Sequence, residues 1–94
     1  MNNAKIIDER DSVATMIENV KKGDVVKFTI SGVQKEIIAM DDIPLYHKIA
    51  INEIKKGDMV TKYGEYIGEA SADIKVGEHV HVHNIMSVRK IVTD

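Results

Sequence analysis

Three of the four histidines in this chain alternate with valines in one short stretch. Imidazole suits both metal binding and proton transfer near neutral pH, so this row is the densest chemical signal in the sequence. If the stretch is a β-strand, its period of two places the histidines on one face and the valines on the other. We therefore expect Val80 and Val82 to face the core. The histidines on the opposite face are His79, His81 and His83.

The row by itself is an awkward metal site. Neighbouring residues on one face of a strand lie roughly 6.5 to 7 Å apart, which is too far for one ion to bind all three imidazoles easily. Two histidines of the row plus an outside group fit an ion better, and the natural candidate for that group is His47. We therefore predict that His47 lies close to the row. The alternative interpretation is a solvated strand face without a function.

Other polar features carry weaker signals. Asp41 and Asp42 stand shortly before the only proline, Pro44, and are typical of a turn. The glycines of residues 63–70 match neither the dinucleotide fingerprint nor the phosphate-binding loop, so turns explain them better. The sequence has no cysteine and no Gly-x-Ser-x-Gly motif, and so it shows no apparatus of a nucleophilic hydrolase.

A recurring turn predicts the strands that must position these groups. An aliphatic residue, a basic residue, a glycine and an acid occur in this order three times, each time followed by aliphatic residues. Glycine favours a turn with positive φ, and β-branched residues favour a strand after it. Strands are therefore expected just after Gly23, Gly57 and Gly77. Because the glycines are unevenly spaced, the pattern is reused turn chemistry and not a solenoid of fixed period.

A β-hairpin is the clearest local prediction. Residues 25–30 and 33–39 are rich in β-branched residues and flank Ser31-Gly32, which has the length and chemistry of a two-residue hairpin turn. Residues 45–51 are a further strand candidate, and Pro44 keeps the chain before them extended.

One short helix is also expected. Apolar residues between positions 12 and 20 recur at helical spacing, with Asp11 or Ser12 available as the N-cap. The predicted fold class is therefore mainly β with short helices. Residues 1–94 are expected to form a single domain, because this length suits one core and is too short for two.

Composition excludes several classes of function. The chain has 13 basic and 15 acidic side chains and a formal net charge of -2, which is not the basic footprint of a nucleic-acid-binding protein. No apolar run reaches the length of a membrane helix, and the first residues lack the apolar stretch of a signal peptide. We therefore expect a cytoplasmic protein that contacts neither nucleic acid nor membrane.

Three segments resemble a known family in their order and spacing. They are residues 42–50 (DIPLYHKIA), 62–68 (KYGEYIG) and 77–84 (GEHVHVHN). Together they are similar to the SAF-like N-terminal domain of the altronate and galactarate dehydratase family, and the resemblance covers nearly the whole chain. It implies an SAF-type β-clip fold, in agreement with the mainly β pattern. In that family the domain either begins a longer polypeptide or forms a separate small subunit, as in the sulfolactate sulfo-lyase.

The resemblance also implies an activity. These enzymes eliminate water, or sulfite in the sulfo-lyase, from a hydroxylated carboxylate, usually with a divalent metal such as iron. The expected function is therefore that of the small subunit of a hydro-lyase for a sugar acid such as altronate or galactarate, inactive without its large subunit. The large subunit would hold most of the metal ligands, and the chain could also form a homo-oligomer. The alternatives are a sulfolactate sulfo-lyase small subunit and a ligand- or metal-binding module without catalysis.

Particular residues receive roles from the resemblance and from the histidine pattern. Lys48 and Asn84 would bind the substrate. Candidate metal ligands are the three histidines of the row, His79, His81 and His83. Catalytic roles fall to His47, His81 and His83.

Two positions depart from the family pattern. Tyr46 stands where the family commonly has glycine, and Val82 where it often has threonine. A glycine before the histidine allows close backbone approach to a ligand, so Tyr46 bears on the identity of the substrate and on the position of His47. Val82 is expected to point inward.

Overall fold

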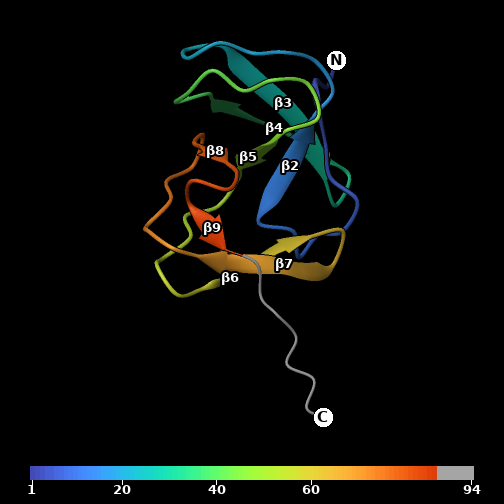
Figure 1. The fold of residues 1–94 in the computed structure, drawn as a ribbon. Helices are drawn as coiled ribbons and strands as arrows, with labels where there is room; N and C mark the ends of the chain where they lie inside the picture. Colours follow the sequence, from blue (N-terminus) through green and yellow to red (C-terminus); the bar gives the residue numbers. More distant parts are fainter. Residues whose placement is uncertain (87–94) are drawn as a thin grey trace.

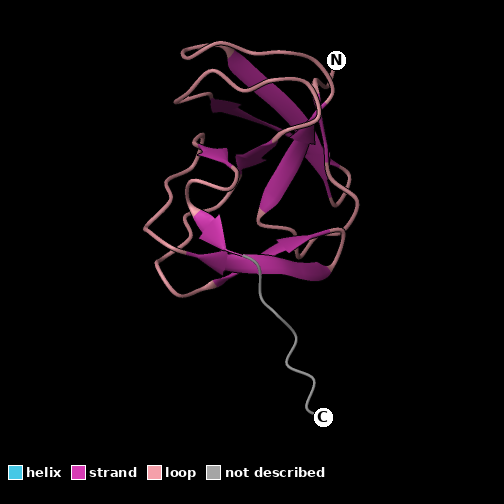
Figure 2. Cartoon of the chain, viewed as in Figure 1, coloured by secondary structure: helices cyan, strands magenta, loops and turns pink. Residues whose placement is uncertain are grey.

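Nine β-strands and no helix make up the part of the chain that the computed structural model describes, residues 1–86 (Figures 1 and 2). None of these residues belongs to a helix long and apolar enough to cross a bilayer. The mainly β prediction is therefore confirmed. The strands are β1 (Ala4–Lys5), β2 (Val13–Met16), β3 (Val25–Ile30), β4 (Val33–Ile38), β5 (Lys48–Ala50), β6 (Met59–Lys62), β7 (Glu65–Ala70), β8 (His79–Val80) and β9 (Ile85–Met86).

A four-stranded antiparallel sheet in the order β1-β2-β5-β8 separates two hydrophobic cores. Successive side chains of a strand point to opposite faces, so Ala14 and Met16 of β2 enter one core while Val13 enters the other. The β3–β4 hairpin closes the first core with Val26 and Phe28. The sheet β6-β7-β9 covers the second core on the opposite side, as Figure 1 shows.

The predicted hairpin is confirmed. Strands β3 and β4 pair from Val25 opposite Ile38 to Ile30 opposite Val33. Ser31 and Gly32 between them have φ values of 51° and 78°. Two positive φ values are what a two-residue turn needs to match the right-handed twist of the strands that it joins.

The short helix expected between positions 12 and 20 is wrong. Residues Val13–Met16 form strand β2, and all four are buried because β1 and β5 flank the strand and a core covers each of its faces. A strand buried on both faces has a nearly continuous apolar run instead of an alternating one. The helical spacing of apolar residues here is therefore a by-product of burial on both sides.

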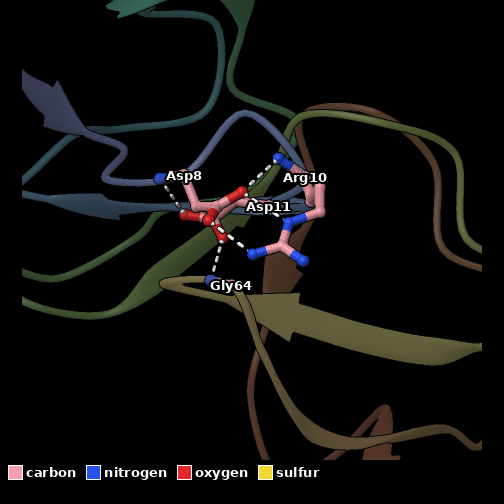
Figure 3. A network of polar contacts seen from close by, with 4 residues as sticks. All are labelled: Asp8, Arg10, Asp11 and Gly64. Carbon is pink, nitrogen blue, oxygen red and sulfur yellow. Dashed lines mark hydrogen bonds and ion pairs between the residues drawn. The ribbon is translucent and has the colours of Figure 1, made fainter.

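The residues expected to cap that helix instead bind β6 and the turn after it. The buried carboxylate of Asp11 accepts a hydrogen bond from the Gly64 N–H at 2.8 Å, and Ser12 Oγ accepts one from the Thr61 N–H at 2.9 Å. Beside them, Arg10 donates two side-chain hydrogen bonds to Asp8, which lower the pKa of Asp8 to about 2 (Figure 3). This polar network ties the loop before β2 to the β6–β7 turn.

The recurring turn of the sequence occurs four times within residues 1–86, once more than the glycine pattern shows. The additional copy spans residues 43–47, with Tyr46 at the glycine position and His47 in place of the acid. In each copy the residue at the glycine position has a positive φ. The N–H of this residue donates a hydrogen bond to the carbonyl of one residue in a neighbouring segment, and the N–H of that same partner donates back to the carbonyl of the next residue of the turn. These partners are Ala39 for Gly23 and Asp24, Met16 for Tyr46 and His47, Ala70 for Gly57 and Asp58, and Ala50 for Gly77 and Glu78.

The expected strand beginnings are confirmed, because β3, β6 and β8 each start two residues after the turn glycine. The strand expected over residues 45–51 is shorter and covers Lys48–Ala50, since residues 45 and 46 belong to the additional turn. Asp42 serves a turn, as predicted, and accepts a hydrogen bond from the Lys22 N–H at 2.8 Å. The site described below therefore begins at a turn and not inside a strand.

Gly77 offers a test of this packing. Its φ is 94°, and a Cβ atom there would overlap the carbonyl oxygen of Ile38. Gly77→Ala should therefore lower the free energy of unfolding by about 2 to 3 kcal/mol, through backbone strain and overpacking together. Gly57→Ala, at φ 91° with nothing within 4 Å of the added atom, should cost only about 1 kcal/mol. Urea unfolding of both variants measures the difference, and equal losses would contradict the close approach at Gly77.

Candidate functional site

His47, His79 and His81 converge into one group, called the histidine cluster below. One ring nitrogen from each of the three imidazoles lies within 4.8 Å of the chosen nitrogens of the other two. His47 Nδ1 is 2.9 Å from His79 Nε2, and the rings of His47 and His81 stack with their centroids 4.5 Å apart. The prediction that His47 lies close to the histidine row is therefore confirmed.

The pairing of β5 with β8 explains this convergence. Lys48 lies opposite Val80 and Ile49 lies opposite His79 in antiparallel register. Continuing the register by one residue places His47 opposite His81, and directly opposed side chains on one face of a sheet lie in contact distance. His79 joins the cluster because it stands two residues before His81 in the sequence. The rings of His79 and His81 are nearly parallel, with their centroids 5.5 Å apart.

The expected strand face over residues 79–83 is only partly correct. Strand β8 ends at Val80, which is fully buried as predicted. The prediction is wrong for Val82, whose side chain is 80% exposed because residues 81–84 turn back towards β9. His83 is exposed in this turn, and its ring lies 5.3 Å from that of His79, outside the cluster.

Asn84 holds this turn in place. Its side-chain oxygen accepts a hydrogen bond from the His81 N–H at 2.9 Å, and its side-chain nitrogen donates to the His79 carbonyl at 2.8 Å. Asn84 is 6% exposed, so these two bonds satisfy a buried amide. The resemblance implies substrate binding by Asn84, whereas the structure shows it fixing the backbone that carries two of the clustered histidines.

Asp41 belongs to the site although the sequence analysis treated it as a turn former. Its carboxylate accepts a hydrogen bond from the His79 N–H at 3.0 Å, across 38 residues of sequence. An Asp-Asp pair before Ile-Pro carries no local signal of this long-range contact. Asp41 thus fixes the start of β8. Its carboxylate also favours the charged form of His79 and so acts to raise the pKa of that imidazole.

The environment of the cluster lowers the pKa of two imidazoles. Burial is the main cause for both His79 and His81, and repulsion from the neighbouring histidines adds to it. Asp41 opposes the shift of His79, while Lys48 adds to that of His81. Both rings are therefore held neutral near pH 7, with a nitrogen lone pair available for a proton or a metal.

Lys48 places a positive charge beside the cluster. Its side chain is partly buried, and its pKa is lowered by this burial and by the charge of Lys62. The residue opposite Lys48 in β2 is Thr15, whose buried hydroxyl has no hydrogen-bond partner among residues 1–86. The sequence pattern indicates Lys48 but not Lys62, because the two lysines lie in different strands, β5 and β6, and influence each other only in the folded chain.

Tyr46 stands at the glycine position of its turn with a φ of 71°. The residue is 72% exposed, so its packing contacts offset little of the free-energy cost of the left-handed backbone. The other three copies of the turn have glycine here. Backbone strain of this kind is often found at functional sites, and here it lies immediately before a histidine of the cluster.

Two surface pockets lie elsewhere, one beside Val20 and Ile43 and the other beside Ala4 and Ile17. Neither is lined by a histidine. The histidine cluster therefore lies outside both pockets, with its three residues only partly buried.

Comparison with known proteins matches most of the chain to one family. The family model described as "Altronate/galactarate dehydratase SAF domain" matches residues 2–88. The altronate dehydratase of Bacillus subtilis is 44% identical over 78 residues, which are 83% of this chain and 15% of that protein. The altronate dehydratase of Escherichia coli is 38% identical over 74 residues, 79% of this chain and 14% of that protein. The chain thus spans only a small part of these dehydratases.

A second group of relatives matches over most of its own length. The (2R)-sulfolactate sulfo-lyase subunit alpha of Chromohalobacter salexigens is 33% identical over 85 residues, which are 87% of this chain and 90% of that protein. The protein of the same name from Paracoccus pantotrophus is 47% identical over 53 residues, 56% of this chain and 79% of that protein. The names of these relatives describe one subunit of a lyase.

The strain at Tyr46 predicts that Tyr46→Gly stabilises the fold. Relief of the left-handed backbone should exceed the added flexibility of glycine, for a net gain of about 0.5 to 1 kcal/mol in the free energy of unfolding. Tyr66, equally exposed at 71% but within strand β7, is the matched control, and Tyr66→Gly should cost about 1 kcal/mol. Urea unfolding measures both. A loss of stability in Tyr46→Gly would mean that the tyrosine ring packs against the domain.

The lowered pKa values predict a pH dependence of stability. The unfolded chain binds protons on His79 and His81 as the pH falls through about 6.5, whereas the folded chain resists them. The free energy of unfolding should therefore fall between pH 7.5 and pH 5.5, and His79→Asn should weaken this dependence. Urea titrations across this range provide the measurement, and a fold that gains stability on acidification would refute the assigned direction.

Proposed function

This chain belongs to the altronate/galactarate dehydratase SAF domain family, and from that membership we propose that it is the small subunit of a hydro-lyase. Its substrate would be a sugar acid such as altronate or galactarate, and a separate large subunit would complete the active site. The observation that carries the proposal is the convergence of His47 with His79 and His81, since residues from two distant segments meet in one chemically competent group.

The proposed reaction breaks two bonds of the substrate. A base takes the proton from the carbon next to the carboxylate, and the electron pair of that C–H bond forms an enediolate. The hydroxyl of the next carbon then leaves with a proton as water, and the resulting enol rearranges to a 2-keto acid. Such a reaction needs a base, a group that stabilises the enediolate and an acid or Lewis acid for the leaving hydroxyl.

The described residues offer part of this set. The neutral imidazoles of His79 and His81 can accept a proton or bind a metal, and exposed His83 stands beside them. The ammonium group of Lys48 suits a substrate carboxylate, because charge-assisted hydrogen bonds are the stronger ones. A divalent metal such as iron would supply the Lewis acid for the leaving hydroxyl when bound. The remaining groups would come from the large subunit.

The surface beside the cluster supports a partner at this place. Tyr46 and Val82 flank the clustered histidines in sequence and expose 72% and 80% of their surfaces. A partner chain that docks here would bury both side chains together with β8, which is the last strand of the central sheet. We therefore place the large subunit against this edge of the central sheet, where it would exclude water from the reacting atoms.

Sulfolactate sulfo-lyase is the second candidate function. The specific observation in its favour is that the match spans 90% of the sulfo-lyase subunit alpha from Chromohalobacter salexigens. In that reaction a C–S bond breaks in place of the C–O bond, and sulfite leaves. The same proton abstraction next to a carboxylate would begin both reactions, so the cluster serves either one.

Reconstitution with the large subunit tests the proposal. We expect the chain alone to be inactive and the mixture to release a 2-keto acid from altronate or galactarate, in a chelator-sensitive reaction. His47→Ala or His81→Ala should lower turnover by about two to four orders of magnitude. Glu36→Ala, at an exposed position of the hairpin strand β4, is the control and should change turnover little.

The choice of substrate separates the two candidates. Sulfite release from sulfolactate, without turnover of either sugar acid, would favour the sulfo-lyase. Unchanged rates in the His47 and His81 variants would show that this subunit acts only as a scaffold.

A further inference from the structure

We infer that His47, His79 and His81 form a divalent-metal site that this chain assembles without its large subunit, with at least one coordination position left open. The inference deepens the proposed function and rests on it only for the reaction that the metal would serve. The sequence suggested two ligand sets, the row of His79, His81 and His83 or two of its members with His47, and the structure brings the second set together. Three ligands would then come from this chain, whereas the sequence analysis assigned most of them to the large subunit.

Distances support a common ion for the three imidazoles. A tetrahedral ion with metal–nitrogen bonds of about 2.0 to 2.1 Å holds its ligand nitrogens about 3.3 Å apart. His47 Nδ1 and His79 Nε2 are 2.9 Å apart, and no pair within the cluster exceeds 4.8 Å. His81 is partly exposed, so a rotation of its ring can bring its nitrogen to the same ion.

The short approach of His47 to His79 has two physical explanations. One ring can donate a proton to the other in a hydrogen bond, or both nitrogens can face one cation through their lone pairs. The second explanation also gives a role to the third imidazole, which strand pairing has already brought into stacking contact with His47. The arrangement of all three therefore points to a shared cation.

The backbone carrying these ligands is anchored at several points. Asn84 binds the His81 N–H and the His79 carbonyl, and Asp41 binds the His79 N–H. Pairing of β5 with β8 fixes the segment of His47 relative to both. Ligand positions held in this way before binding reduce the ordering cost of metal capture.

The ligand type selects the class of metal. Three neutral imidazoles suit Fe²⁺, Co²⁺, Ni²⁺ or Zn²⁺, whereas Mg²⁺ and Ca²⁺ prefer oxygen ligands. Three protein ligands with an open position are typical of catalytic rather than structural metal sites. The open position would receive water, a substrate oxygen or a ligand from the large subunit.

Cobalt binding to the full chain, without an affinity tag, tests the site. We expect Co²⁺ to bind with 1:1 stoichiometry in calorimetry and to produce visible absorption bands, and Mg²⁺ to give neither signal. His47→Ala, His79→Ala and His81→Ala should each weaken Co²⁺ binding about 100-fold or more, because each removes a direct ligand. His83→Ala removes an equally common metal ligand from the same turn, outside the cluster, and should change the affinity less than about threefold.

Several outcomes would overturn the inference. One is the absence of saturable Co²⁺ binding, and another is an equal loss of affinity in His83→Ala, which would indicate chelation by the exposed row. His81→Gln provides a milder variant that preserves size, and Zn²⁺ should raise the melting temperature of the wild-type chain but not of this variant. Loss of turnover in the histidine variants without any metal binding would refute the metal site and leave the proposed function standing. Metal binding combined with unchanged turnover in the histidine variants would support the metal site and refute the proposed function of the cluster.

Discussion

The candidate site depends on the antiparallel register between β5 and β8. This register sets Lys48 opposite Val80, and through it His47 meets the segment of His79 and His81. A slip by one residue would turn Val80 out of the second core and the histidines away from one another. The free energy gained by burying apolar side chains on both faces of the central sheet therefore also holds the imidazoles together.

The repeated turn shows how the fold provides a place for chemistry. Three copies combine glycine with an acid and serve only to start a strand. The fourth copy uses the same backbone hydrogen bonds but carries Tyr46 and His47 at these two positions. Backbone hydrogen bonds with Met16 maintain this turn. The fold therefore accepts the strained Tyr46 and the imidazole of His47 at these two positions.

The polar residues around the cluster divide their tasks. Asn84 and Asp41 bind backbone groups and so set the positions of the histidines, while His47, His79, His81 and Lys48 remain partly exposed. The Lys48 ammonium and the neutral imidazoles of His79 and His81 therefore lie together in a chain whose formal net charge is -2. Such a local arrangement suits an anionic ligand such as a carboxylate, whose binding does not depend on the overall charge.

Local chemistry in the sequence determined the mainly β class, the hairpin around Ser31-Gly32 and the strands after the turn glycines, because turns and β-branched runs act over a few residues. Only tertiary structure decided the rest. Burial on two faces made Val13–Met16 a strand instead of a helix, and the buried amide of Asn84 curled the chain so that Val82 faces solvent. The sequence pattern predicted that His47 lies close to the row, but strand pairing and the turn held by Asn84 decided that His79 and His81 join it while His83 does not.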